Sequence, residues 1–167
     1  MKTVDASEVI DSLGLPYFRA LSTFGALSDE VILALLNGGV IKQFEKGEYI
    51  DRDCKIAEEF QVVLVGKIAF YKHFVGQDVL TRYFQKGEQI AFDLMIGLIQ
   101  HDGVDVAMET SQILEISSAQ FFKLHVNYPA EFGLLMINLA RELSREISML
   151  EDVIGKSSGW LQADKGE

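Results

Sequence analysis

Cysteine, proline and positive charge are all scarce in this sequence of 167 residues. Cys54 is the single cysteine, so the chain can form no internal disulfide, no zinc site built from cysteines and no iron–sulfur cluster held by four of its own thiolates. The 15 basic residues are outnumbered by 25 acidic ones, and a net charge of −10 is unfavourable for binding phosphate backbones. Since no basic patch stands out, we expect no direct DNA binding.

Long apolar runs are missing as well. The richest stretches, residues 31–36 and 133–140, are far shorter than the roughly 20 residues that a membrane span requires. The N-terminus acquires charge at Lys2 and Asp5, so it does not resemble a signal peptide. An unpaired cysteine fits a reducing compartment. We therefore expect a cytoplasmic protein with no membrane association.

The chain has enough apolar material, 49% of its residues, to form one folded domain, and its first 39 residues are expected to be helical. Residues 7–13 have helical apolar spacing and end at Gly14, shortly before Pro16. Ser28 precedes two acidic residues and an apolar run, which is the pattern of a helix N-cap. The glycines at 38 and 39 are expected to end this later helix.

Residues 40–118 are predicted to form an antiparallel, double-stranded β-roll of the jelly-roll kind. Segments rich in Val, Ile, Phe and Tyr, such as residues 61–65, 67–71 and 79–84, are separated by glycines. Short strands at spacings of about 8–12 residues are typical of sandwiches and rolls. Turns are expected at the glycines numbered Gly47, Gly66, Gly76, Gly87 and Gly103.

A short repeat supports the roll. The segments Phe-Glu-Lys-Gly-Glu-Tyr-Ile (44–50) and Phe-Gln-Lys-Gly-Glu-Gln-Ile (84–90) agree at five of seven positions and lie 40 residues apart. Each reads as the end of a strand, a Lys-Gly turn and the start of the next strand. We interpret the two copies as equivalent corners of the roll, the alternative being chance recurrence of a common turn.

Helical spacing returns in residues 119–155. Pro129 is suited to the first turn of a long helix, and Gly155 is expected to end it after residue 154. The polar residues 156–167 are expected to be a flexible tail. The helix carries an apolar stripe that either packs on its own roll or forms a homodimer seam, and we favour the seam, formed by Met136, Leu139, Leu143, Ile147, Leu150 and Ile154.

The order of these elements resembles the cyclic-nucleotide-binding domain family, and most of all the effector domain of the Crp/Fnr bacterial regulators. The resemblance covers roughly residues 17–154, and the segments that carry it are residues 24–30, 44–50, 65–68, 87–93, 107–111 and 113–116. It implies an α+β fold in which a β-roll is flanked by N-terminal helices and a long C-terminal dimerisation helix. It also implies a ligand between the roll and the start of that helix.

The segments that hold the nucleotide in this family are altered here. The resemblance implies a Gly-Glu that holds the ribose and a following Arg that pairs with the cyclic phosphate. This chain has residues 90–94 (Ile-Ala-Phe-Asp-Leu) and then 101–107 without an arginine, while Asp102 and Asp105 would repel a phosphate. The Phe92-Asp93 pair resembles the Fnr branch of the family. That branch binds an iron–sulfur cluster, which the single cysteine of this chain cannot hold. The 13 residues after Ile154 are too few for the family's helix-turn-helix.

Other candidate sites carry less weight. His101 with Asp102 and Asp105 could ligate a metal, but such residues around a glycine are more often solvated in a turn, and no metal site is expected. The motif of the catalytic cupins, a His-x-His with a later Glu and His, is absent, and no catalytic residues are proposed. Cys54 lies among charged residues and is interpreted as a surface thiol without an assigned role.

We therefore expect a non-catalytic regulatory or sensor domain with a degenerate phosphate site and no cofactor, acting as a homodimer. Its effector would be a small molecule or another regulator. Two alternatives remain open: a true receptor for cyclic AMP or cyclic GMP with an unusual pocket, and an interaction protein that pairs with a full-length Crp/Fnr regulator. The residues expected to line a ligand site are Tyr71, Arg82, Ile90, Ala91, Phe92, Asp93, Val106 and Ala107.

Overall fold

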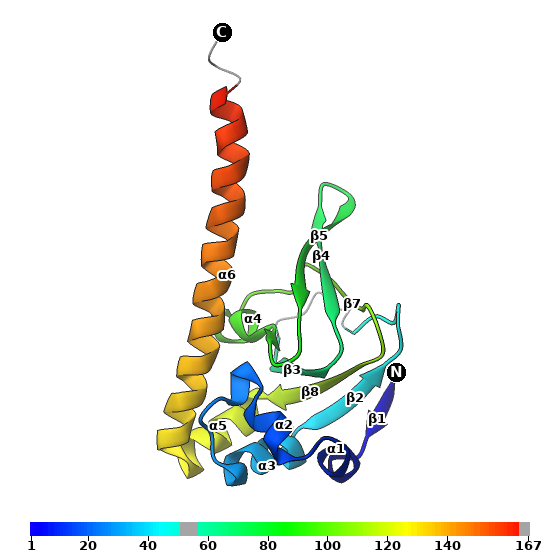
Figure 1. The fold of residues 1–167 in the computed structure, drawn as a ribbon, viewed down its shortest axis with the longest axis vertical. Helices are drawn as coiled ribbons and strands as arrows, with labels where there is room; N and C mark the ends of the chain where they lie inside the picture. The colour runs from blue at the N-terminus through cyan, green and yellow to red at the C-terminus, as the bar shows by residue number, and fades with distance from the viewer. Residues whose placement is uncertain (51–56, 164–167) are drawn as a thin grey trace.

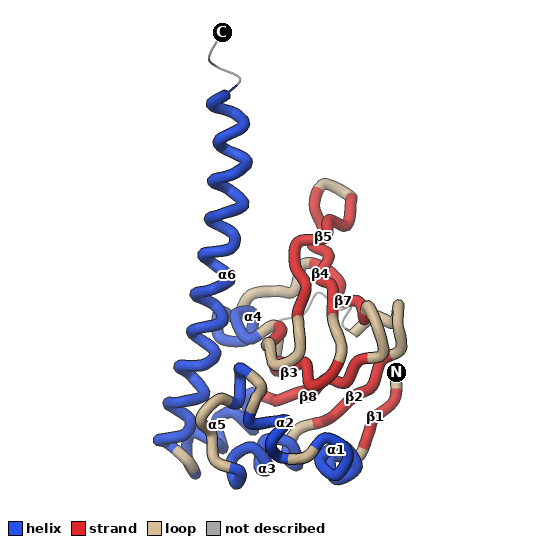
Figure 2. Tube along the Cα trace, in the orientation of Figure 1, coloured by secondary structure: helices blue, strands red, loops and turns tan. Residues whose placement is uncertain are grey.

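The computed structural model describes residues 1–50 and 57–163, with side chains as far as residue 156. Cys54 lies outside the described residues. The strands of the chain form two antiparallel sheets, which confirms the expected β-roll (Figure 2). The five-stranded sheet has the order β1 (Lys2–Val4), β2 (Val40–Phe44), β8 (Ser111–Ser117), β3 (Glu59–Val65) and β6 (Gln89–Ile90). The three-stranded sheet has the order β5 (Gln77–Phe84), β4 (Ile68–Phe74) and β7 (Gly103–Ala107).

Helices pack at one end and one side of the roll (Figure 1). They are α1 (Ala6–Leu13), α2 (Leu15–Arg19), the 3₁₀ helix η1 (Ser22–Phe24), α3 (Asp29–Gly38), α4 (Phe92–Gly97), α5 (Ser118–Asn127) and α6 (Pro129–Ala163). The expected ends of the first helices are confirmed. Gly14 follows α1 with a φ of 78°, and the Ser28 hydroxyl accepts a hydrogen bond from the Val31 N–H at 3.3 Å as the N-cap of α3.

The expectation of helices alone in residues 1–39 is wrong at the start of the chain. Lys2–Val4 form strand β1, which pairs antiparallel with β2. A strand at a sheet edge leaves a row of unpaired backbone groups, and pairing with a short additional strand satisfies part of that row. Three residues are too few for a recognisable alternation, so the pattern alone gave no signal for this strand.

The two repeated segments form equivalent corners, as predicted. Gly47 and Gly87 both have a φ of 86°, a conformation that favours glycine. In each corner the glutamate that follows the glycine caps the turn: Glu48 accepts a hydrogen bond from the Glu45 N–H at 2.9 Å, and Glu88 accepts one from the Gln85 N–H at 2.7 Å. The Lys-Gly-Glu sequence thus closes the same turn twice.

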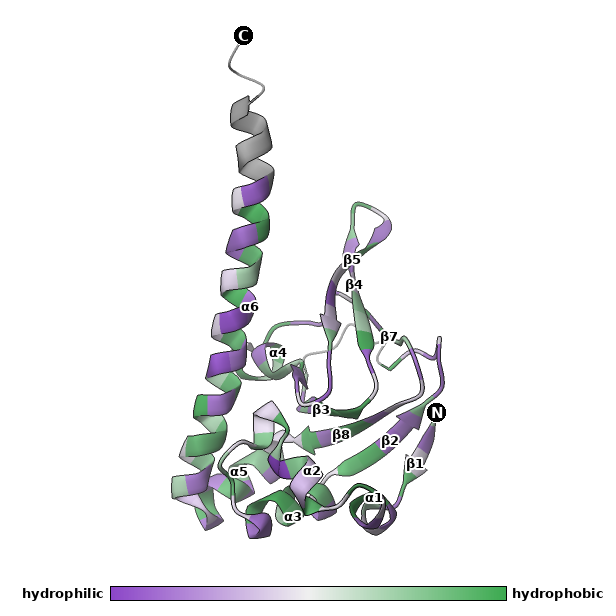
Figure 3. Ribbon diagram, in the orientation of Figure 1, coloured by the Kyte–Doolittle hydropathy of each residue, from purple (hydrophilic) through white to green (hydrophobic). Residues whose placement is uncertain are grey.

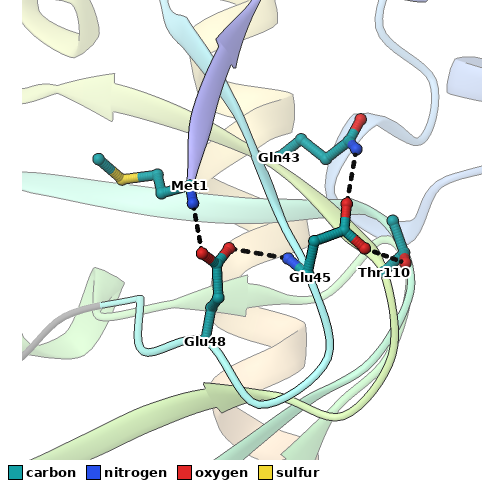
Figure 4. A network of polar contacts seen from close by, with 5 residues as sticks. All are labelled: Met1, Gln43, Glu45, Glu48 and Thr110. Atoms are coloured by element: carbon teal, nitrogen blue, oxygen red, sulfur yellow. Dashed lines mark hydrogen bonds and ion pairs between the residues drawn. The ribbon is translucent and has the colours of Figure 1, made fainter.

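The first corner is held by a further polar network (Figure 4). The N-terminal ammonium of Met1 contacts the Glu48 carboxylate, which ties β1 to the turn. The Glu45 carboxylate accepts hydrogen bonds from the Thr110 hydroxyl at 2.8 Å and from the Gln43 amide at 3.1 Å. These contacts join the corner to neighbouring strands but involve no residue of α6.

Gly103 is not a turn residue, contrary to the sequence interpretation. It is the first residue of β7 and pairs with Lys72 of β4. A Cβ atom at this position would lie 2.4 Å from the Phe70 ring and 2.5 Å from the Tyr71 carbonyl oxygen. The glycine is therefore needed for close packing between two strands, because any side chain would collide with β4.

The long helix α6 begins at Pro129 as predicted but continues past Gly155 to Ala163, so the expected end and most of the expected flexible tail are wrong. A glycine inside a helix costs only about 1 kcal/mol relative to alanine, and it ends a helix only where the chain turns into the left-handed conformation. Figure 1 shows α6 continuing well past the roll. Within the described residues, no helix combines the length and the apolar character needed to cross a membrane.

The two Lys-Gly corners allow a matched test of how tightly each turn glycine is packed. Replacing Gly47 by alanine should destabilise the protein by about 1 kcal/mol, because alanine is strained at a positive φ but meets nothing within 4 Å. Replacing Gly87 by alanine should cost at least about 1 kcal/mol more, because the new Cβ lies 2.9 Å from the Ser22 backbone nitrogen. Urea unfolding of both variants measures the difference, and equal costs would contradict it.

Candidate functional site

A cavity of about 320 Å³ lies between the roll and α6. Its roll side is formed by strands β4, β5, β6 and β7, helix α4 and the segment between α4 and β7, and α6 lies on the other side. Its apolar lining consists of Phe70, Phe84, Ile90, Ala91, Leu94, Ile99, Met149 and Leu150. Its polar lining consists of Lys72, Thr81, Arg82, Asp93, Gln100, His101, Asp102, Asp105 and Glu146. The cavity is thus an apolar chamber with several charged groups in its wall.

Half of the residues predicted for a ligand site line this cavity, namely Arg82, Ile90, Ala91 and Asp93. The other four, Tyr71, Phe92, Val106 and Ala107, do not. Strand periodicity explains two of these placements. Phe70 and Lys72 face the cavity, so Tyr71 between them faces the other side, and Val106 follows the lining residue Asp105 in the same way.

The remaining two residues belong to the core. Phe92 is 1% exposed and its ring contacts those of Phe60 and Phe121, so it anchors the start of α4. Ala107 is equally buried, in a smaller cluster with Phe44 and Ile68. A continuous apolar segment does not reveal which of its residues face a cavity and which face the core.

The interpretation of His101 and Asp105 as solvated turn residues is wrong. His101 is 6% exposed and Asp105 2% exposed, and the two side chains contact each other, with 2.9 Å between Nε2 of the imidazole and Oδ2 of the carboxylate. The His101 ring also packs against Phe70. Among the residues that the structure describes, no three His, Cys, Asp or Glu side chains are grouped so that they could hold a metal ion.

Arg82 projects from β5 into the cavity and forms an ion pair with Glu146 of α6. The guanidinium is 12% exposed and stacks on the Phe84 ring at 4.3 Å from its centroid. Sequence reasoning identified Arg82 but missed Glu146, because the charged positions of a helix do not indicate which of them faces a cavity. Together these two residues form the direct polar link between the roll and α6 inside the cavity.

Two further basic side chains of the cavity, Lys72 and His101, also face carboxylates of the same chain. Lys72 Nζ lies 3.9 Å from Asp102 Oδ2, and both side chains are largely exposed. His101 faces Asp105, as described above. Each of these basic side chains therefore already faces a carboxylate, and Asp93 adds a further carboxylate to the lining.

A second glutamate of α6 is buried outside the cavity. Glu142 is 5% exposed and accepts hydrogen bonds from the Ser22 hydroxyl at 2.5 Å and from the Gln89 N–H at 3.0 Å. It thus connects α6 to η1 and to the second Lys-Gly corner at once. One turn earlier on the helix, the Asn138 amide donates to the Gly25 carbonyl at 2.7 Å. These contacts fix this part of α6 on η1 and on the second Lys-Gly corner.

Burial raises the pKa of Glu142 above its ordinary value, although the hydrogen bonds from Ser22, Gln89 and Thr23 lower it in part. The hydroxyl geometry is compatible with a protonated form. The Ser22 oxygen lies 2.5 Å from Glu142 and 2.8 Å from the Gly87 carbonyl oxygen, but a hydroxyl has only one proton to donate. A protonated Glu142 can donate to Ser22 while Ser22 donates to Gly87.

The predicted dimer stripe divides into three parts. Leu139 is fully buried in the main hydrophobic core of its own chain, so its assignment to an interface is wrong. Met136 and Leu143 are half-buried and pack against the same core. Ile147, Leu150 and Ile154 are exposed, at 57%, 47% and 62%. Figure 3 shows hydrophobic and hydrophilic residues alternating along this part of α6.

No protein-family model and no curated protein matches the chain. Solved structures do. A cyclic nucleotide-binding domain from Methylobacillus flagellatus KT aligns at a TM-score of 0.76 and 16% identity, over 93% of this chain and 88% of that one. The sensor domain of the transcriptional regulator DNR from Pseudomonas aeruginosa aligns at 0.63 and 18% identity, over 80% and 90%.

The catabolite activator protein of Thermus thermophilus aligns at a TM-score of 0.67 and 22% identity, over 82% of this chain. The aligned region spans 63% of that longer protein. The chain therefore has the β-roll fold of cyclic nucleotide-binding domains, including those of Crp/Fnr-type regulators, as the sequence resemblance predicted. At these identities the similarity establishes the fold.

The raised pKa of Glu142 predicts a pH-dependent contribution to stability. A carboxyl group that binds its proton more tightly in the folded state stabilises the fold below its ordinary pKa and loses this contribution as the pH rises through the folded-state value. Wild-type protein should therefore lose stability relative to Glu142→Gln as the pH rises above the ordinary carboxyl pKa of 4.5, by about 1.4 kcal/mol for each tenfold difference in proton affinity.

Urea unfolding at several pH values measures this effect. Glu151→Gln removes the same charge from an exposed position of the same helix and serves as the control. A difference between wild type and Glu142→Gln that stays constant over the whole range, or that grows in favour of the wild type as the pH rises, would contradict the prediction.

Proposed function

We propose that this chain is a non-catalytic regulatory sensor domain that acts as a homodimer and binds a small molecule between its roll and α6. The observation that carries the proposal is that one segment of α6 both lines the cavity and exposes apolar side chains. Glu146, Met149 and Leu150 of α6 line the cavity, while Ile147 and Ile154 on the adjacent side of the helix are exposed. A molecule in the cavity thus touches the helix segment that presents an apolar seam.

The spacing of the apolar residues supports a seam distinct from the roll contact. Met136, Leu143, Ile147 and Ile154 are separated by seven, four and seven residues, so they share one face of the helix. The neighbouring face of the helix is buried in the core and against η1, and it carries Leu135, Asn138, Leu139 and Glu142. Past the roll, a monomer would leave the seam in water, whereas a parallel pair of α6 helices would bury it.

The apolar side chains of the seam together can support a stable pair. Burial of a large aliphatic side chain contributes about 1.5–3 kcal/mol before the costs of ordering and association. Ile147, Leu150 and Ile154 in both chains make six such side chains, and the half-buried Met136 and Leu143 add to them. The solved structures with the same fold include sensor and regulatory domains, which is consistent with this function.

The charges of the cavity support a degenerate phosphate site. A cyclic nucleotide brings one phosphate charge, which needs a cation that it can pair with. Arg82 and Lys72 both face carboxylates of the same chain, and Asp93 and Asp105 add negative charge to the lining. A cyclic phosphate would have to displace one of these carboxylates.

Cyclic AMP and cyclic GMP are therefore expected to bind with dissociation constants above roughly 100 μM, or about −5.5 kcal/mol. Isothermal titration calorimetry with each nucleotide measures this. A dissociation constant in the low micromolar range for either nucleotide would overturn the degenerate site and favour the alternative of a true cyclic-nucleotide receptor.

The dimer is tested by placing charges on the seam. The double variant Ile147→Glu with Ile154→Glu should sediment as a folded monomer where the parent is a dimer, because like charges would face each other across the seam. Both positions are exposed, so the roll itself should stay folded.

The matched control, Phe122→Glu with Val126→Glu, introduces the same charges at exposed apolar positions of α5 and should remain dimeric. Analytical ultracentrifugation at tens of micromolar protein distinguishes the states. A monomeric parent protein, or a seam variant that stays dimeric, would refute the seam.

A further inference from the structure

Arg82 is the cation of the cavity with the least contact with water. Its side chain is 12% exposed, whereas that of Lys72 is 52% exposed. The guanidinium carbon lies over the Phe84 ring, 4.3 Å from its centroid, and the Glu146 carboxylate contacts the guanidinium from the other element. A fixed and largely desolvated guanidinium is a strong binding group for a carboxylate, sulfonate or phosphate.

The partner of Arg82 comes from the helix opposite. Glu146 is 25% exposed and reaches across the cavity from α6 to the guanidinium. The lining around this ion pair is apolar and includes Phe70, Ile90 and Met149. A molecule that matched this chamber would therefore have an apolar body and one anionic group placed where the Glu146 carboxylate now lies.

We infer that Glu146 is a built-in competitor for an anionic ligand: the cavity takes an amphipathic anion whose acidic group replaces the Glu146 carboxylate on Arg82. This inference rests on the proposed function, because it takes the cavity as the ligand site. Glu146 belongs to the same chain and is always close to Arg82. A ligand therefore displaces it from Arg82 only if the apolar body of the ligand adds binding energy.

The other carboxylates of the lining do not prevent an anionic ligand from pairing with Arg82. Asp105 contacts His101 and Asp102 lies near Lys72, so each already faces a basic group of its own. Asp93 is exposed at the first turn of α4, where water screens its charge. Displacing Glu146 therefore leaves Arg82 as the group that pairs with the ligand.

The exchange acts on a specific part of α6. Glu142, one helical turn before Glu146, remains bound to Gln89 and Ser22 outside the cavity. The link that the ligand breaks is the next one along the helix, directly before Ile147. Ligand binding would thus release the exposed part of the proposed seam, from Ile147 onward, while the buried anchor stays in place.

Two fluorescent probes that differ in charge test the inference. 8-Anilinonaphthalene-1-sulfonate is an amphipathic anion, and N-phenyl-1-naphthylamine has almost the same apolar body without the sulfonate. Glu146→Gln should bind the anionic probe about tenfold more tightly than wild type, which corresponds to about 1.4 kcal/mol, because its competitor charge is gone. The neutral probe should bind both proteins alike.

Three controls isolate the effect. Glu151→Gln removes an exposed charge from the same helix and should leave the affinity for the anionic probe unchanged. Adding Arg82→Gln to Glu146→Gln should abolish the gain, because the pairing cation is lost. If Glu146→Gln fails to fold, Glu146→Asp retracts the carboxylate by one methylene and should give a smaller gain in the same direction.

The outcomes separate the inference from the proposed function. If the neutral probe binds but the anionic probe gains nothing from Glu146→Gln, or gains equally from Glu151→Gln, the competitor role is wrong and the cavity still serves as a ligand site. Equal gains for both probes would mean that the variant merely opens the cavity, which also overturns the competitor role. If neither probe binds any of the proteins, the ligand site itself is wrong and the inference falls with it.

Discussion

A buried carboxylate on the long helix, Glu142, holds the two main parts of the molecule together. It accepts a backbone hydrogen bond from Gln89, beside the second Lys-Gly corner, and a hydroxyl hydrogen bond from Ser22 of the N-terminal helices. Burying a carboxylate is costly unless its oxygens are satisfied, so the corner, η1 and α6 must keep their relative positions. The cavity lies one turn further along α6, and its shape depends on this anchor.

Features with a local physical cause could be predicted from the sequence. Gly14 and Ser28 delimit helices through backbone geometry and capping, and both act within a few residues of their own position. The two corners are similarly local, because Glu48 and Glu88 close their turns on residues three positions earlier. The fold class follows from these short signals and from their order along the chain.

Features that depend on distant partners could not be predicted. Nothing near Arg82 indicates that it meets Glu146, since the two lie on different elements far apart in sequence. The burial of Asp105 depends on His101 and on the packing of β7 against β4, and a Gly-containing acidic segment without this context looks solvated. The prediction that α6 ends at Gly155 is wrong, because a glycine signals the end of a helix only together with a chain reversal.

The length of α6 gives the anchor at Glu142 a mechanical meaning. From that residue to Ala163 the helix runs without interruption for about 32 Å. A rotation of about 5° at the anchor would therefore displace the far end by about 3 Å, a lever that enlarges a change too small to disturb the roll. A movement of α6 by about an ångström beside the cavity would thus become, at the far end of the helix, a displacement comparable to the size of a side chain.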